Sequence, residues 1–124
     1  MMDTALERVL NALSMIRCGA ACTEDELHAL TAKTLTDAGI PAMHEARLAP
    51  GCRIDFLAGD VGIEIKKSRP ERAKLIAQLT RYAACDQVDS LVVAAPRGVY
   101  LPKMIGGKRV TMVALERLWG ISLP

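Results

Sequence analysis

The chain has 124 residues, of which 51% are hydrophobic, and this suits one domain over residues 1–124 with a modest buried core. Its formal net charge of +2 does not by itself indicate a nucleic-acid partner, and 3% aromatic residues are too few for a surface that stacks many bases. The charges of Asp3, Glu7 and Arg8 interrupt the N-terminal apolar residues, which excludes a secretory signal or a membrane span there.

The cysteines lack the paired spacing of a zinc or iron–sulfur site. They are Cys18, Cys22, Cys52 and Cys85. We therefore expect free and mostly buried thiols. Free thiols together with the missing secretory signal predict a reducing, cytoplasmic location.

An amphipathic helix is predicted over residues 4–17, with Gly19 as its C-terminal stop. Its apolar stripe is wide enough that a single core need not cover all of it. We therefore expect the N-terminal helical region, residues 1–20, to offer an interface for a homodimer. The stripe consists of Leu6, Val9, Leu10, Leu13 and Ile16.

A second helix is predicted to begin after Thr23, because Thr23 and Glu26 have the spacing of a capping box. Residues 39–41, a Gly-Ile-Pro sequence, end it. A short strand over residues 42–48 and a turn over 49–51 follow. The helix residues expected to face the core are Leu27, Leu30, Thr34, Leu35 and Ala38.

The stretch RIDFLAGDVGIEIKK, residues 53–67, predicts a β-hairpin with strands over 53–58 and 61–67. Gly59 and Asp60 suit a two-residue turn. The register counted outward from this turn places Asp55 opposite Glu64. Alternation assigns two faces to the hairpin. The core face has Ile54, Phe56, Ile63 and Ile65, and the other has Asp55, Glu64 and Lys66.

Two carboxylates placed opposite each other destabilise a sheet unless something compensates for their charge. A divalent cation between Asp55 and Glu64 would do so, and Mg²⁺ or Mn²⁺ suits hard oxygen ligands. Lys66 lies on the same side and could orient a metal-bound water or take its proton. These are the parts that phosphodiester hydrolysis requires. The alternative is a solvated hairpin face with scattered charges.

A third helix is predicted from Ser68 to about Cys85, with a capping box of Ser68 and Glu71 and with Pro70 in the first turn. The apolar run over residues 91–95 predicts a strand that is buried on both faces. Residues 96–124 form a C-terminal extension with a strand over 110–114 and a short helical segment over 115–119. Gly106 and Gly107 are expected in a turn.

The pattern Ile54-Asp55 … Glu64-Ile65-Lys66 resembles the PD-(D/E)xK nuclease superfamily, although Ile54 replaces the proline before the first acid. Gln78 and Tyr82 resemble the Q-x-x-x-Y element of its RecB-type and phage-exonuclease-type branch. The resemblance implies an α/β (α+β) fold: a restriction-endonuclease-like αβββαβ core over residues 23–95, with a mixed central sheet flanked by helices. The N-terminal helix is extra to that core.

The resemblance also implies an activity, the Mg²⁺- or Mn²⁺-dependent hydrolysis of DNA, structure-selective or independent of sequence. The metal would be held by Asp55, Glu64, the Ile65 carbonyl and an acid on the first core helix. That acid is Glu24, which lies nearer the apolar stripe, or Glu26. The expected catalytic residues are Asp55, Glu64, Lys66, Gln78 and Tyr82, and the expected contacts to the DNA backbone are Lys67, Arg69, Lys74 and Arg81.

Two other functional classes fit the sequence. One is an inactive nuclease-fold module that binds DNA or a partner protein, and the other is a structural subunit of a larger nucleic-acid-processing complex. His28 and His44 share no metal-ligand spacing. We expect His28 on the helix surface and His44 in a strand or loop.

Overall fold

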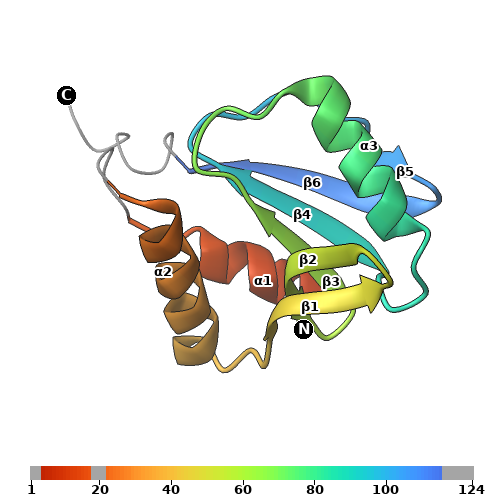
Figure 1. Cartoon of the computed structure of the whole chain (residues 1–124). Coiled ribbons are helices and arrows are strands. Elements are labelled where there is room, and N and C mark those ends of the chain that lie inside the picture. Colours follow the sequence, from red (N-terminus) through yellow and green to blue (C-terminus); the bar gives the residue numbers. More distant parts are fainter. Residues whose placement is uncertain (1–3, 18–21, 116–124) are drawn as a thin grey trace.

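The computed structural model describes residues 4–17 and 22–115, which form three helices and a mixed six-stranded sheet (Figure 1). The α+β class is therefore as predicted. The helices are α1 (Ala5–Leu13), α2 (Glu24–Asp37) and α3 (Arg72–Ala83). The strands are β1 (Met43–Ala49), β2 (Cys52–Ala58), β3 (Val61–Ile65), β4 (Ser90–Ala95), β5 (Met104–Ile105) and β6 (Lys108–Ala114).

The strands lie in the order β1-β2-β3-β4-β6-β5. β1, β2 and β3 are antiparallel, whereas β3, β4 and β6 run parallel to one another, and α3 connects β3 to β4. Helix α3 covers one face of the sheet, and α1 and α2 lie on the other side (Figure 1). Because β3 and β4 are covered on both faces, nearly every position in them is apolar.

Helix α2 begins as predicted. The Glu26 N–H donates to Thr23 Oγ1 at 3.1 Å, and the Thr23 N–H donates to Glu26 Oε1 at 2.8 Å. The core face differs in part from the prediction, because Thr31 is buried and Ala38 is exposed. Ala38 is the C-cap residue, where the helix has already ended.

Helix α1 is shorter than predicted and ends at Leu13. Its apolar stripe packs within the chain: Val9, Leu13 and Ile16 are buried in one cluster with residues of α2 and the sheet. Leu6 and Leu10 of the stripe are only partly buried against this cluster, and the dimer interface on this helix stays a prediction. The predicted stop, Gly19, lies outside the described residues.

Helix α3 begins at Arg72, four residues later than predicted. Its N-cap residue is Glu71, whose side chain makes no capping hydrogen bond. The predicted capping box of Ser68 and Glu71 is wrong. Pro70 explains this, because a proline disfavours the helical conformation in the residue before it, here Arg69.

The C-terminal part has one strand more than predicted, since the short β5 pairs with β6. The turn between these strands contains Gly106 and Gly107, as predicted, and both have positive φ values (56° and 78°). Residues 116–119 of the predicted terminal helical segment lie outside the described residues.

Cys52 and Cys85 are free and half-buried, whereas Cys22 is disulfide-bonded. The expectation of free thiols is therefore wrong for Cys22. Within residues 4–17 and 22–115, no helix has the length and apolar character that crossing a membrane requires.

Close packing at the centre of β3 gives a test of the fold. A Cβ at Gly62 would lie 2.7 Å from Ile54 Cδ1 and 3.0 Å from Leu91 Cδ2. We expect Gly62→Ala to lower the free energy of unfolding by about 1–3 kcal/mol through overpacking, although alanine otherwise costs less than glycine in a strand. Urea unfolding measures the change.

Gly98→Ala is the matched control, because its Cβ would meet no atom closer than Met112 Cγ at 3.3 Å. This variant should change stability much less. Equal stability of Gly62→Ala and the wild-type protein would contradict the packing described here.

Candidate functional site

The β2–β3 hairpin has the predicted turn and the predicted register next to it. The paired residues are Ala58 with Val61, Leu57 with Gly62 and Phe56 with Ile63. The pairing ends there, because the Ile65 N–H donates to the Asp55 carboxylate, Oδ2, at 2.7 Å. β3 continues beside β4, where Ile65 pairs with Ala94. The predicted backbone pairing of Asp55 with Glu64 is therefore wrong, and the two strands separate at these acids.

A second irregularity lies in β1, where Glu45 has a φ of +52°. His44, before it, stacks on Phe56 with ring centroids 4.7 Å apart, on the α2 side of the sheet. Ala46, after it, packs with Ile54 in the cluster on the α3 side. The prediction that Ile54 shares a face with Phe56 is wrong, because both strands change face at this point.

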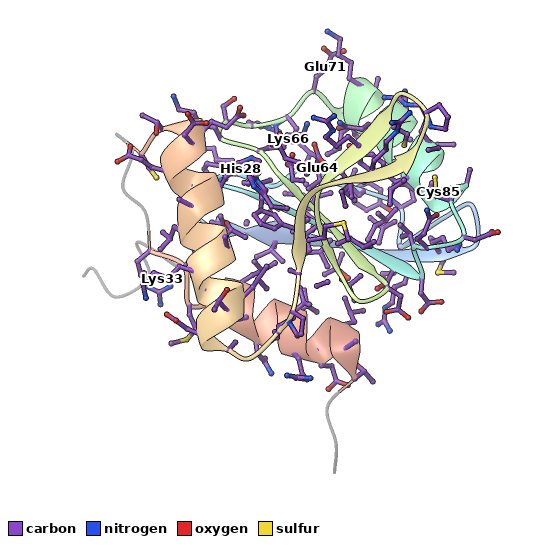
Figure 2. The ribbon with its side chains drawn as sticks, turned by 60° about the horizontal axis from the view of Figure 1, so that its bottom comes forward. His28, Lys33, Glu64, Lys66, Glu71 and Cys85 are labelled. Carbon is purple, nitrogen blue, oxygen red and sulfur yellow. The ribbon has the colours of Figure 1, made fainter. Side chains whose placement is uncertain are left out.

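The separation of β2 and β3 opens a cleft of about 640 Å³ between the sheet and α2. Figure 2 shows His28 on the side of α2 that faces Glu64 and Lys66, whereas Lys33 of the same helix points away. The polar residues lining the cleft are Glu24, Asp25, His28, His44, Glu45, Asp55, Glu64 and Lys66.

Glu64 is 4% exposed, and both of its carboxylate oxygens have partners. Oε2 lies 3.1 Å from Lys66 Nζ. The Tyr82 hydroxyl lies 3.0 Å from Glu64 Oε1 and 3.0 Å from the Arg53 carbonyl oxygen, so its one hydrogen is shared between two acceptors. Lys66 Nζ also donates to Gln78 Oε1 at 3.1 Å. Gln78 and Tyr82, one turn apart on α3, thus reach the strand that carries Glu64 and Lys66.

Asp55 faces a histidine pair that the sequence analysis did not assign to the site. His28 Nε2 lies 3.8 Å from Asp55 Oδ2, and His28 Nδ1 lies 3.0 Å from His44 Nε2. The His28 side chain is 15% exposed, so its predicted place on the open helix surface is wrong. Its spacing from Glu24 could have indicated this, because residues four apart on a helix share a face.

Electrostatics at the cleft favour a cation. Burial, followed by the charge of Asp55, raises the pKa of Glu64, and Lys66 opposes this rise. Burial also raises the pKa of Asp55, against the Ile65 N–H, His28 and Lys66, while Glu24 adds to the rise. A divalent cation would stabilise both ionised carboxylates.

Two carboxylates and one backbone carbonyl at the cleft are the candidate metal ligands. Among residues 4–17 and 22–115, no group of three or more His, Cys, Asp or Glu side chains is arranged to hold a metal. Mg²⁺ usually binds proteins through one or two carboxylates and retains several waters. Asp55, Glu64 and the Ile65 carbonyl could bind an ion in this way.

The two candidate helix acids lie in different surroundings. Glu24 lines the cleft. Glu26 is fully exposed and accepts hydrogen bonds from Thr23, which hold its pKa below the usual range. Of these two acids, only Glu24 lines the cleft and acts on the charge of Asp55, so the geometry favours Glu24 over Glu26 as the helix acid.

Two of the residues predicted to contact DNA, Lys74 and Arg81, line a second groove that also contains Lys66. This groove of about 470 Å³ along α3 is lined by Lys66, Lys74, Gln78 and Arg81 among others. Lys67 and Arg69 are exposed in the segment between β3 and α3. An acidic cleft and a basic groove therefore meet at Lys66.

Comparisons with known protein families, curated proteins and solved structures find no match for this chain.

The raised pKa of Asp55 predicts a stability change in buffer free of divalent cations. A carboxyl whose pKa is raised in the folded state stabilises the fold in its protonated form. This contribution is complete below the ordinary pKa and is lost as pH rises through the raised pKa. Asp55→Asn removes the charge and keeps an acceptor for the Ile65 N–H. We expect it to raise the Tm at pH 7 by ~4 °C, which corresponds to about 1 kcal/mol.

The gain in Tm should disappear at about pH 3, where the Asp55 carboxyl of the wild-type protein is largely protonated in both the folded and the unfolded state. Calorimetry at the two pH values measures it. Asp37→Asn is the control, since the exposed Asp37 pairs with Lys33 and should gain nothing. A lower Tm for Asp55→Asn at pH 7 would mean that the contacts of the carboxylate outweigh its burial.

Proposed function

We propose that this protein is a metal-dependent nuclease that hydrolyses phosphodiester bonds of DNA. The observation that carries the proposal is the position of Lys66. Its ammonium group lies 3.1 Å from the buried Glu64 carboxylate and 3.1 Å from Gln78, and it lines the same cleft as Asp55. A lysine fixed beside two acids of raised pKa is suited to water activation at a metal site.

In this proposal Asp55, Glu64 and the Ile65 carbonyl hold Mg²⁺ or Mn²⁺, with Glu24 nearby. When bound, the ion polarises the scissile phosphate and lowers the pKa of water. The Lys66 ammonium donates a hydrogen bond that orients the attacking water. It could take a proton from that water only after losing one of its own, because an ammonium nitrogen has no acceptor lone pair. Gln78 is a positioning residue for the Lys66 ammonium.

Tyr82 has a different role, because its hydroxyl fixes the Glu64 carboxylate and ties it to the Arg53 carbonyl of β2. It is therefore also a positioning residue. Both α3 side chains would act through other residues, Tyr82 through Glu64 in β3 and Gln78 through Lys66, which directly follows that strand.

DNA is the proposed substrate because exposed cations flank the cleft. Lys67, Arg69, Lys74 and Arg81 would contact the phosphate backbone, and such contacts carry no sequence information by themselves. The proposal is therefore for cutting that is structure-selective or independent of sequence.

Two variants test the activity. We expect Asp55→Ala and Lys66→Ala to lower the Mg²⁺-dependent cleavage rate by about 10²-fold or more, since general acid–base groups contribute factors of this size. The assay is a cleavage panel in Mg²⁺ and in Mn²⁺: linear duplex, single strand, flap, four-way junction and supercoiled circle.

Asp37→Ala and Lys33→Ala are matched controls, because they remove the same residue types from the outer face of α2. Both should cut at the wild-type rate. If correctly folded Asp55→Ala and Lys66→Ala cut as well as the wild-type protein, the proposed assignment is wrong.

One observation favours a second candidate, an inactive module that binds DNA or a partner protein. The Glu64 carboxylate already has protein partners for both of its oxygens, Lys66 Nζ and the Tyr82 hydroxyl, so it does not require a cation. Calorimetry with Mn²⁺ separates the two candidates. Binding that Asp55→Ala abolishes supports the nuclease, whereas no heat of binding and no cleavage support the module.

A further inference from the structure

Two segments leave the sheet side by side at the edge that carries Lys66. The Lys66 N–H donates to the Ala94 carbonyl at 2.8 Å, so the parallel strands β3 and β4 end together. In Figure 1 the segment that enters α3 and the segment that follows β4 run next to each other above this edge. We call residues 66–74 and 96–103 the basic rim.

Tyr100 is the exposed aromatic residue of this rim. It is 78% exposed. Arg72 at the start of α3 holds it in two ways. Arg72 Nε donates to the Tyr100 carbonyl at 2.7 Å, and the guanidinium carbon lies 5.6 Å from the ring centroid. A charged anchor therefore fixes the segment while most of the ring stays accessible.

The charge around this ring matches a nucleic-acid backbone. Residues 66–74 include five basic residues and one acid, Glu71. Lys67, Arg69, Arg72 and Lys74 are exposed. Clustered lysine and arginine bind phosphates without regard to sequence, and every base presents a flat face on which an aromatic ring can stack.

We propose that Tyr100 is a base-stacking residue and that the basic rim binds strands with an unpaired nucleotide. Bases inside a closed duplex have both faces covered by their neighbours, so the ring can stack only on an unpaired or terminal base. The inference rests on the proposed function for the substrate class, and it narrows that class to single strands, overhangs and flaps. One ring contacts one base, which agrees with the scarcity of aromatic residues.

The experiment measures binding without cleavage, by fluorescence anisotropy of a labelled 12-nucleotide single strand in EDTA. We expect Tyr100→Ala to weaken binding by about 5- to 100-fold and Tyr100→Phe to bind as the wild-type protein does. The affinity for a relaxed, covalently closed circular duplex, measured by competition, should be the same for all three proteins. Met43→Ala removes another exposed apolar side chain, on β1, and should change nothing.

A second oligonucleotide series identifies the stacked base. An abasic nucleotide is moved along the strand one position at a time. With the wild-type protein one abasic position should weaken binding as much as Tyr100→Ala does, and with Tyr100→Ala that position should have no further effect. Thermal unfolding checks that each variant is folded.

Three results would overturn the inference: a folded Tyr100→Ala that binds the single strand as the wild-type protein does, an equal loss on the closed circle, or a loss in Tyr100→Phe as large as in Tyr100→Ala. The proposed nuclease activity is judged separately. A protein that shows the stacking signature in EDTA but cuts no DNA would refute the nuclease and leave this inference standing.

Discussion

The hydrogen bond from the Ile65 N–H to the Asp55 carboxylate is the constraint on which the site depends. It replaces a bond that the hairpin ladder would otherwise make, so β2 and β3 separate while β3 stays paired with β4. The Asp55 carboxylate is thereby held between the two strands. A strand side chain normally points out from the face of the sheet instead. The same separation opens the cleft that α2 borders.

The surrounding contacts offset the charge that this arrangement buries. Burying the Glu64 carboxylate to 4% exposure would lower the stability of the fold if the Lys66 ammonium and the Tyr82 hydroxyl did not contact it. Both partners depend on α3, because Gln78 fixes Lys66 and Tyr82 belongs to the helix. Docking of α3 therefore completes the site. Burial still raises the pKa of Asp55 and of Glu64, so these contacts compensate for only part of the cost of burying the two charges. Carboxyls with a shifted pKa in a cleft are typical of functional sites.

Local signals in the sequence predicted several parts of the fold. Thr23 and Glu26 marked the start of α2, and Gly59 with Asp60 marked the hairpin turn and the register beside it. The spacing of Gln78 and Tyr82 correctly placed both on one helix face, with their side chains reaching β3. These features involve neighbours along the chain, so a short pattern contains the information.

Other parts depend on backbone conformation or on distant contacts, and the sequence pattern missed them. Simple alternation assigned Ile54 to the wrong face because it cannot show that Glu45 is left-handed. His28 looked like a surface residue because its partners, His44 and Asp55, come from β1 and β2. The capping spacing of Ser68 and Glu71 predicted too early a start for α3, because Pro70 disfavours the helical conformation in the preceding residue and the helix begins only at Arg72.

The left-handed backbone of Glu45 also limits which residues β1 tolerates at this position. Glycine, asparagine and aspartate adopt this conformation most easily, whereas valine and isoleucine strongly resist it. Valine or isoleucine at position 45 would therefore straighten β1 and turn His44 away from Phe56. A substitution that makes β1 more regular at position 45 would therefore disturb the wall of the cleft.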